Sequence, residues 1–583
     1  MTGAAYPRQA RTGPARALPI LGWRRGYDRQ VLRHDLIAGL TVAVMLVPQS
    51  MAYAALAGMP PVTGLYAATV PVLVYALLGT SGSLAVGPVA ITALMTATAL
   101  APLANGDPGR FAALAGLLAL LVGAIQVLMG VLRLGALVNF MSHSVLSGFT
   151  SAAALVIAAS QVKDLLGLRA ERAENLPGIL TSLWQAAPTV HLLTVAVAGV
   201  SIAGLVLLRR YVPKLPGALL VVAAVTAVSA VLALGDRGVP ILADVPSGLP
   251  VPDLPSIALA DVRALLPAAV AIALVAYMEG IAVAKSLAAR SRQHVDPNAE
   301  LVAVGAANVA AGAFHAFPVA GGFSRSAVNF SAGARTPVAS VVTAAVVAAT
   351  ALLLTPAFHH LPKAVLGAIV VVAVLGLVDH RGARTAWRTR RADGVTLALT
   401  FLVTLVAGVE AGLAVGVGFS LVVFLHRSAR PHTAELGRVP GTGTFRNVAR
   451  YQGLVTDPQV AVLRIDGPLY FANAEYLADQ LSALAEDRPS LHAVVLDASA
   501  ISDADTDGAH TLAQARDRLA GRGVALHLAT VRGPVRDLLT RSGLWPAMRE
   551  AGQLHPEVAD AVDAAAGTPD GSDRTPRLPQ EVY

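Results

Sequence analysis

The sequence predicts a polytopic α-helical membrane protein that continues into a small α/β domain. Of the 583 residues, 55% are hydrophobic and only 14% are charged, and the mean hydropathy of +0.62 is too high for a soluble protein that must cover its core with polar surface. Apolar segments long enough to cross a bilayer, or half of it, recur as far as residue 426. Beyond that point, short β-rich runs alternate with helical ones, which is typical of a small α/β fold.

The composition also excludes several classes of function. The chain has no cysteine, so disulfides and thiolate metal sites are ruled out. The net charge of +8 comes from arginines that flank apolar runs, which indicates membrane orientation rather than nucleic-acid binding. The pair His359-His360 has no carboxylates at ligand spacing, and no nucleophile, acid/base pair or phosphate loop stands out. We therefore expect neither an enzyme nor a bound cofactor or metal.

About fourteen membrane segments can be drawn, in two sets of seven. The first set is 36–56, 62–78, 88–103, 111–132, 137–160, 190–208 and 217–234. The second set is 263–288, 299–313, 323–332, 336–355, 363–378, 394–409 and 411–426. A full span needs about 20 residues, so segments 3 and 10, near residues 88 and 323, are predicted to be half helices. An odd number of segments in each set predicts two repeats, 35–234 and 261–427, that run oppositely through the membrane.

Basic residues test the orientation, because short cytoplasmic loops carry an excess of Lys and Arg. With the N-terminus inside, the cytoplasmic loops hold the following residues: Arg133, Arg209, Arg210, Lys214, Arg290, Arg292, Arg335, Arg381, Arg384, Arg388, Arg390 and Arg391. The segment 1–34 carries seven arginines and no apolar core, so it is no cleavable signal. We expect a multi-pass protein of the inner membrane, with the segment 1–34 and the C-terminal domain both cytoplasmic.

The C-terminal part divides into three stretches. Residues 428–450 are polar and are expected to form a linker between the membrane domain (35–427) and the α/β domain (451–565). In the α/β domain, runs such as VAVLRI and HAVVLDA read as strands, and AEYLADQLSALAED reads as a helix. The tail 566–583 is rich in Pro, Asp, Arg and Ser and is expected to be disordered.

Several motifs resemble a known family. The first span holds Val47-Pro-Gln-Ser-Met-Ala-Tyr-Ala54, followed by Gly58-Met-Pro-Pro-Val-Thr-Gly-Leu-Tyr66. Further matches are Gly79-Thr-Ser, Val86-Gly-Pro88, Gly148-Phe149, Ser160-Gln161, Asn298 to Leu301, Gly305, Asn308 and Ser324-Arg325. Together they resemble the sulfate permease (SulP) family of anion transporters, related to the animal anion exchangers and prestin. Gly467-Pro-Leu-Tyr-Phe-Ala-Asn473 and Asp505-Thr506 resemble the STAS domain, shared by sulfate transporters and anti-sigma-factor antagonists.

Two Gly/Ser/Pro-rich interruptions predict the substrate site. They are 79–88 (GTSGSLAVGP) and 317–326 (FPVAGGFSRS), one in each half of the membrane domain. A helix beginning at Pro88 and one beginning after Gly321-Gly322 would each present free N–H groups and about +0.5 of a charge, and Arg325 would add a full positive charge. The resemblance implies that the two ends face each other across an anion. The alternative is that the glycines serve helix packing and that Arg325 pairs with a carboxylate.

Side chains of the first span complete this predicted site. Gln49 and Tyr53 lie four residues apart, on one helix face just after Pro48, and the resemblance implies that both face the substrate. Interhelical packing and hydrogen bonding is the alternative for both. The full set of predicted substrate-binding residues is Gln49, Tyr53, Gly87, Pro88, Phe323, Ser324 and Arg325.

Glu279 is the carboxylate most suited to ion coupling. It lies deep in an apolar helix, where a charge costs about 2.5–3.5 kcal/mol, so it should be protonated, paired or bound to a cation. With Glu279 protonated the site keeps about +2 of charge, and with Glu279 ionised about +1, so proton binding would favour a dianion. The alternative is a structural ion pair with Arg325 or Lys285. Glu300, at the start of the next span, is expected to be an interfacial cap or contact.

Thr506 is a candidate regulatory residue in the α/β domain. It occupies the strand-to-helix turn where, by resemblance, related antagonists carry a phosphorylatable hydroxyl. The same Asp505-Thr506 pair is also an ordinary helix N-cap.

These observations predict secondary active transport of a small oxyanion, with sulfate and proton coupling as the first choice. The resemblance implies a transport core of spans 1–4 and 8–11, a scaffold of spans 5–7 and 12–14, and a homodimer. Sodium-coupled bicarbonate or dicarboxylate transport is one alternative. An anion-binding membrane sensor with STAS output, or an uncoupled channel, is the other. The partners expected are thus a small anion, a coupling proton or sodium ion, and the lipid bilayer.

Overall fold

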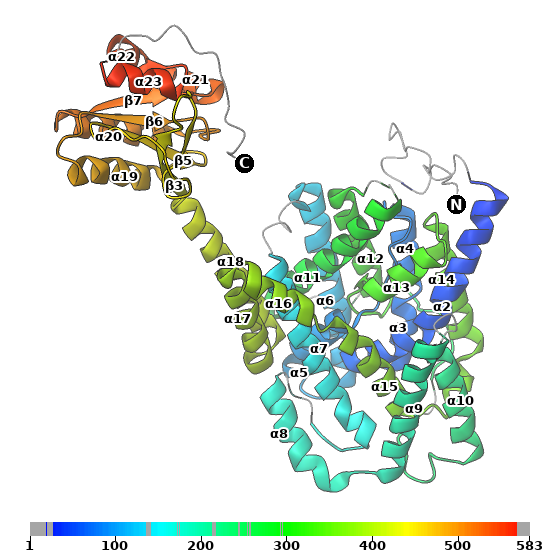
Figure 1. The fold of residues 1–583 in the computed structure, drawn as a ribbon. Coiled ribbons are helices and arrows are strands. Elements are labelled where there is room, and N and C mark those ends of the chain that lie inside the picture. The colour runs from blue at the N-terminus through cyan, green and yellow to red at the C-terminus, as the bar shows by residue number, and fades with distance from the viewer. Residues whose placement is uncertain are drawn as a thin grey trace. The chain divides into compact units, whose positions relative to one another are not determined.

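The computed structural model describes residues 19, 27–135, 142–171, 173, 175–212, 217–242, 245–253, 255, 258–291, 293 and 295–567. The chain divides into two compact units, Met1–Ser420 and Leu421–Tyr583. The first is almost wholly helical and the second contains a six-stranded sheet (Figure 1). Most of segment 1–34 and of the tail 566–583 lies outside the described residues, although the first long helix already begins at Arg29.

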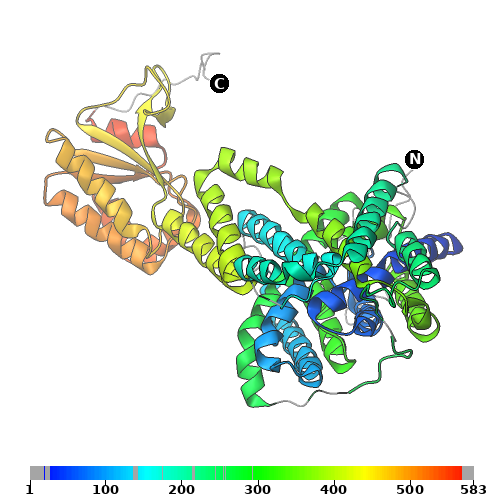
Figure 2. The same cartoon turned by 90° about the horizontal axis from the view of Figure 1, so that it is seen from below.

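The helices of the first unit follow the predicted order. The first set is α2 (Arg29–Ala57), α3 (Pro61–Ala67), α4 (Val70–Leu78), α5 (Ala90–Ala104), α6 (Pro108–Val131), α7 (His143–Leu166), α8 (Leu176–Ala186), α9 (Leu192–Tyr211) and α10 (Gly217–Val231). The second set is α11 (Leu259–Ser291), α12 (Pro297–Ala313), α13 (Phe323–Ser331), α14 (Val338–Leu353), α15 (Lys363–Val374), α16 (His380–Thr389), α17 (Arg391–Ala407) and α18 (Val409–Ala429). Many of these helices are seen nearly end-on in Figure 2, as in a bundle of roughly parallel spans.

Length and composition agree with a polytopic membrane protein. In the part of the chain that the structure describes, eight helices are long and apolar enough to span a membrane, and three shorter apolar helices accompany them. Two helices were not predicted: α8, in the loop after α7, and the arginine-bearing α16. The predicted segment 62–78 is divided into α3 and α4, because Pro71 lies in the first turn of α4 and cannot continue the preceding helix.

A two-residue strand precedes each half helix. Strand β1 (Val86–Gly87) leads to α5, strand β2 (Ala320–Gly321) leads to α13, and the two strands pair antiparallel. The predicted start of the first half helix at Pro88 is wrong by two residues: α5 begins at Ala90, with Val89 in an extended conformation as its N-cap. Pro88 stays outside the helix because it continues the extended segment that pairs with β2.

The C-terminal unit is an α/β fold with helices on both faces of one sheet. The strands are β3 (His432–Arg438), β4 (Phe445–Asn447), β5 (Val460–Asp466), β6 (Ala493–Asp497), β7 (Ala525–Ala529) and β8 (Leu554–His555), in the order β4-β3-β5-β6-β7-β8. Strands β5 to β8 are parallel, and β3 is antiparallel to both its neighbours. One face packs against α19 (Ala474–Asp487), α20 (Thr506–Ala520), α21 (Gly533–Arg541) and α22 (Leu544–Glu550), and the other against α23 (Val558–Ala565).

The stretch expected to be a linker, 428–450, differs from that expectation. Its residues form β3 and β4, and β3 pairs with β5 from His432–Asp466 to Leu436–Val462. The sequence of β3 is polar at most positions because only Ala434, Leu436 and Gly437 face buried surroundings. A single short strand of this kind carries too weak an alternation to be recognised without its partner.

Candidate anion-binding site

Several hydrogen bonds join the two half helices and the segments before them, besides the β1–β2 pairing. The Nη1 of Arg325 donates to the carbonyl of Pro88 at 2.6 Å, and the N–H of Gly322 donates to Ala85 O at 3.0 Å. The N–H of Ala85 also donates to Ser326 Oγ at 2.9 Å, and Asn329 Nδ2 donates to Ser83 O at 3.1 Å. Side chains of α13 therefore fix the backbone that leads into α5.

Neither half helix has a side-chain cap at its N-terminus among the described residues. The N-caps are Val89 for α5 and Gly322 for α13, and neither can accept a hydrogen bond through its side chain. By contrast, α2, α6, α7 and α12 are each capped by the side chain of an Asp or Ser. The first N–H groups of a helix need an acceptor, so two uncapped ends close together are suited to an anion.

Both N-termini open into one large cavity, of about 1260 Å³. The predicted residues that line it are Gln49, Tyr53, Glu279, Phe323, Ser324 and Arg325. Gly87 and Pro88 do not belong to the described lining; the first half helix contributes Val89, Ala90 and Ile91 instead. Pro88 acts on the cavity through its carbonyl, which holds Arg325.

The guanidinium of Arg325 is buried, with only 2% of the residue exposed, and only one of its three nitrogens is engaged. Nε and Nη2 have no hydrogen-bond partner among the described residues, whereas Nη1 is bound to Pro88. Glycine beside it leaves room for this position of the guanidinium, because a Cβ at Gly322 would lie 2.8 Å from Nη2. Arg325 thus presents two buried, unsatisfied donors, and such donors are costly unless a ligand accepts from them.

Glu279 enters the same cavity from α11. Its Oε2 is buried and has no hydrogen-bond partner, and no ion pair joins it to Arg325 within the described part of the chain. Lys285 lies on the same helix but is exposed. The close approach of α11 to β2 depends on glycines, since a Cβ at Gly321 would lie 2.8 Å from the Cα of Gly280.

Gln49 and Tyr53 meet on the cavity face of α2, as their spacing predicted. Gln49 Nε2 donates to the hydroxyl of Tyr53 at 2.9 Å, and Gln49 Oε1 has no partner among the described atoms. The amide is therefore held by the phenol, and the Tyr53 hydroxyl keeps its own proton available for an acceptor in the cavity.

A buried carboxylate that the sequence did not single out for the site organises the loop before β1. Glu300 Oε1 accepts from the N–H of Thr80 at 2.6 Å, from its hydroxyl at 2.5 Å and from the N–H of Ser81 at 3.0 Å. Its Oε2 accepts from the Tyr75 hydroxyl at 2.9 Å. Glu300 is 2% exposed, so its contacts are buried within the protein, where it tethers the segment that leads to α5.

Asn308 plays a matching part for the second half helix. Its side chain exchanges two hydrogen bonds with the backbone of Val319, at 2.7 and 3.0 Å, as a neighbouring strand would. A third bond runs from Asn308 Nδ2 to Gln126 Oε1 at 3.0 Å. Sequence reasoning noted Asn308 only as a family match; a buried amide in an apolar helix, opposite an interruption, was the available signal.

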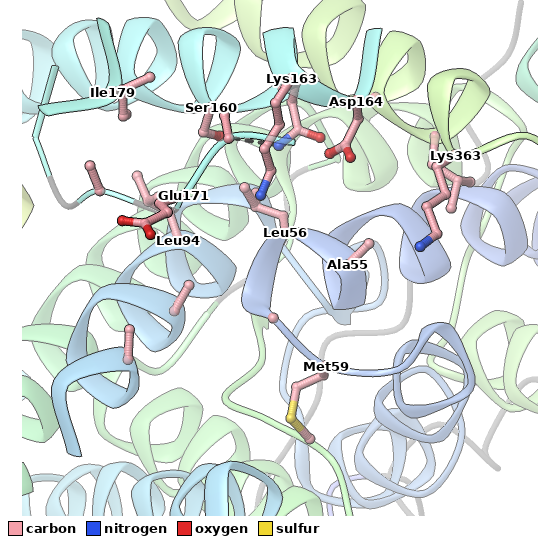
Figure 3. A pocket seen from close by; sticks show the side chains of 18 of the residues that line it. Ala55, Leu56, Met59, Leu94, Ser160, Lys163, Asp164, Glu171, Ile179 and Lys363 are labelled. Atoms are coloured by element: carbon pink, nitrogen blue, oxygen red, sulfur yellow. Dashed lines mark hydrogen bonds between the residues drawn. The ribbon is translucent and has the colours of Figure 1, made fainter. Parts of the chain in front are cut away.

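A second, smaller cavity of about 420 Å³ lies further along the same helices. It is lined by the C-terminal end of α2, by α5, by α7 and by the start of α15. Figure 3 shows Lys163, Asp164 and Lys363 around it, together with Ser160, whose hydroxyl accepts from Gln161 Nε2 at 3.1 Å. This cavity includes the predicted family motif Ser160-Gln161.

In the C-terminal unit, Thr506 is the exposed first residue of α20. Asp505 is the N-cap, and its carboxylate accepts from Gly508 N at 2.7 Å and from Phe471 N at 2.9 Å. The capping role of the pair is thus present.

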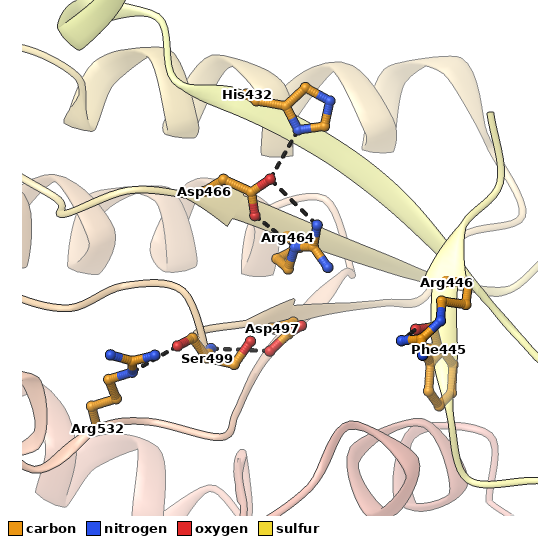
Figure 4. A network of polar contacts seen from close by, with 8 residues as sticks. All are labelled: His432, Phe445, Arg446, Arg464, Asp466, Asp497, Ser499 and Arg532. Carbon is orange, nitrogen blue, oxygen red and sulfur yellow. Dashed lines mark hydrogen bonds and ion pairs between the residues drawn. The ribbon is translucent and has the colours of Figure 1, made fainter. Parts of the chain in front are cut away.

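Elsewhere on this sheet, Asp466 bonds Arg464 and His432 (Figure 4). Burial raises the pKa of Asp466, but these two partners outweigh it and the pKa ends below its usual value.

Comparison with known proteins decides the family. The model of the sulfate permease family matches residues 32–400, and that of the STAS domain matches residues 451–561. The chain belongs to the sulfate permease family. It is accordingly a multi-pass membrane protein that transports an anion, and it is a permease rather than an enzyme.

Relatives of known name support the assignment along most of the chain. A probable sulfate transporter of Mycobacterium tuberculosis is 39% identical over 530 residues, covering 90% of this permease and 94% of the relative. Chloroplastic sulfate transporter 4.1 of Arabidopsis thaliana is 38% identical over 547 residues, covering 90% and 79%. Among solved structures, murine Slc26a9 in the inward-facing state has a TM-score of 0.88 at 25% identity, covering 97% of this chain and 99% of that one.

Proposed function

We propose that this permease carries sulfate across the inner membrane. The observation that carries the proposal is the convergence of two uncapped half-helix ends and two unpaired nitrogens of Arg325 on one cavity. Two helix ends and one guanidinium supply about +2 of charge. That charge suits a compact dianion, and the many donors suit an acceptor with oxygens on all sides. The names of the relatives point to the same substrate.

The two cavities support transport by alternating access. On α2, α5 and α15, the large cavity ends at Tyr53, Ile91 and Ile369, and the small one begins at Ala55, Leu94 and Gly367. The barrier between them is therefore about one helical turn or less on each helix. Ala54, Ala93 and Ala368 lie within it and are fully buried. Small side chains allow close packing there, so a modest shift of one helix group against the other could move the barrier to the other side of the site.

The basic residues support one orientation in the membrane. The large cavity reaches Arg209 at the end of α9, and Arg210 follows it, so the positive-inside rule favours a cytoplasmic position for this end. We propose that the structure is open to the cytoplasm, with segment 1–34 and the α/β domain on that side. We also propose a membrane domain at 35–427 and a STAS domain at 451–565. A homodimer and regulation through Thr506 are further proposals.

Uptake by proteoliposomes tests the substrate. The purified protein should accumulate labelled sulfate, and unlabelled sulfate should compete more strongly than bicarbonate, fumarate or chloride. Parallel runs with proton and with sodium gradients separate the two kinds of coupling. Preferential uptake of bicarbonate with sodium, or of a dicarboxylate, would replace sulfate as substrate. Saturable binding of sulfate without flux would favour the sensor. Sulfate flux that never accumulates sulfate against its gradient would favour a channel.

We further propose that Glu279 couples sulfate to protons. It lines the cavity with Arg325 and has an oxygen without a hydrogen-bond partner, so its charge acts on the bound anion without being neutralised by an ion pair. Protonation keeps the site near +2, and ionisation lowers it to about +1. A dianion and a proton should therefore bind together, which is symport by linkage.

Substitution of Glu279 by Gln tests the coupling. The amide cannot ionise, so Glu279→Gln should abolish sulfate accumulation driven by a pH gradient while sulfate/sulfate exchange continues. Glu410→Gln is a matched control, because Glu410 lies in the first turn of α18 and is not part of the described cavity lining. Transport assays at fixed pH and with an imposed gradient distinguish the two effects. Proton-driven accumulation that survives in Glu279→Gln would refute this role.

A further inference from the structure

A third charged side chain lines the large cavity. Among its described lining residues, the Lys, Arg, Asp and Glu side chains are Arg325, Glu279 and Arg209. Arg325 is buried at the half helices, whereas Arg209 is exposed, in the last turn of α9. The cavity follows α2 from Ile37 to Tyr53, a helix length of about 24 Å. It is thus a corridor with an arginine at the site and another nearer to solvent.

The side chain of Arg209 is directed into this corridor by the helix period. Leu205 and Arg209 are four residues apart, on one face of α9, and both line the cavity. The next residue, Arg210, is also exposed but is not part of the lining. Across the corridor, Nη2 of Arg209 lies 4.0 Å from the position that a Cβ on Gly376 would take, just after α15.

A purely structural role would require a partner for Arg209. An arginine that caps the end of α15 would donate to one of its last carbonyls, and one that fixes α9 would pair with a carboxylate. Neither a hydrogen bond nor an ion pair links Arg209 to any described residue. Its charge is therefore available to an ion passing through the corridor.

We propose that Arg209 is an accessory anion-binding residue, at which an oxyanion such as sulfate pauses between the solution and the site at Arg325. This inference rests on the proposed function, because it concerns the path of the same anion. A cation at the mouth of a low-dielectric cleft raises the local anion concentration and the rate of binding. The effect belongs to one side of the membrane only, since Arg209 lies in the cavity that is open at the end of α9.

Single cysteines give a direct test, because the natural chain contains none. Arg209→Cys should raise the sulfate KM measured from the α9 side about 5-fold, and leave the KM from the opposite side unchanged. A cationic methanethiosulfonate should restore the KM, and an anionic one should raise it further. Arg210→Cys, treated in the same way, should change the KM less than about 2-fold. The effect of Arg209→Cys should shrink with added salt, because the screening length falls from about 30 Å at 0.01 M to about 10 Å at 0.1 M.

The outcomes separate this inference from the proposed function. If the wild-type protein takes up no sulfate, the proposed function is wrong and the inference fails with it. If the wild type transports sulfate but Arg209→Cys behaves like Arg210→Cys, only the inference is overturned. It is also overturned if both sides of the membrane are affected equally, or if the cationic reagent labels the thiol without restoring KM, because either result indicates a structural role.

Discussion

At the scale of single residues, the site depends on what is left unpaired. Arg325 uses one nitrogen to hold Pro88 and keeps two for the cavity, and Gln49 and Glu279 each keep one oxygen without a partner among the described residues. In a protein interior such groups lower stability unless a ligand satisfies them. Their concentration around one cavity, beside two uncapped helix ends, supports the proposed binding site over a mere packing arrangement.

Substitution of Arg325 should affect binding before anything else. Arg325→Ala removes a full charge and two donors, and should raise the sulfate KM by about 10- to 100-fold, or about 1.4–2.8 kcal/mol. Arg325→Lys keeps the charge but cannot hold Pro88 and present two further donors in a plane, so we expect an intermediate KM. Uptake kinetics of both variants, with a thermal-unfolding control, measure this. An unchanged KM in Arg325→Ala would remove Arg325 from the site.

At the scale of elements, the half helices are positioned by polar side chains on their neighbours. Glu300 on α12 holds the loop before β1, and Asn308 on the same helix holds the segment before β2. One helix therefore fixes both approaches to the site. A comparable carboxylate, Asp35 on α2, accepts from the N–H groups of Arg335 and Thr336, just after α13.

The tether formed by Glu300 can be tested by graded removal. Glu300→Gln replaces a charged acceptor of four hydrogen bonds and should destabilise the protein by about 1–3 kcal/mol. Tyr75→Phe removes one of those bonds and should cost less, about 1 kcal/mol. The melting temperatures of the purified proteins should fall in the order wild type, Tyr75→Phe, Glu300→Gln. Equal melting of Glu300→Gln and the wild type would show that the network does not stabilise the loop.

At the scale of the whole molecule, two units of different chemistry share one chain. The membrane unit buries a large apolar core that also encloses polar side chains such as Glu300, Asn308 and Arg325, and the C-terminal unit buries the two faces of a sheet. The C-terminal unit also holds a stacked pair, His527 and His555, whose Nδ1 and Nε2 atoms lie 3.0 Å apart. Burial, followed by the charges of His555 and His492, lowers the pKa of His527 to about 4.

The two units should therefore respond differently to acid. Unfolded His527 takes up a proton near pH 6.5 and folded His527 only near 4, so the C-terminal unit should lose stability as pH falls from about 6.5 to 4. The measurement is the rate of amide hydrogen exchange in β7 of the full chain, compared at each pH between the wild type and His527→Gln. Because the intrinsic exchange rate depends on pH in the same way in both proteins, the difference between them reports the change in stability. A peptide from α2 is the internal control. Identical pH dependence in the wild type and His527→Gln would contradict the assignment.

Much of this architecture could be predicted, and the omissions have physical reasons. The long apolar spans and the interruptions near 88 and 323 are local features of hydropathy, so they were found. Strands β3 and β4 were missed because each needs a neighbour to be a strand at all. The start of α5 was misplaced because Pro88 favours a helix start locally, whereas pairing of β1 with β2 keeps it extended.

The sequence by itself determined the fold class, the two-part organisation, the half helices and the candidate residues Gln49, Tyr53, Glu279 and Arg325. These follow from composition, periodicity and motifs, which need no knowledge of distant contacts. Only the tertiary structure decided that Arg325 binds Pro88 and not Glu279, that Glu300 is an interior tether, and that Arg209 shares the cavity. Those facts depend on which residues, hundreds of positions apart, lie side by side, because a hydrogen bond or a charge acts over a few ångströms and not along the chain.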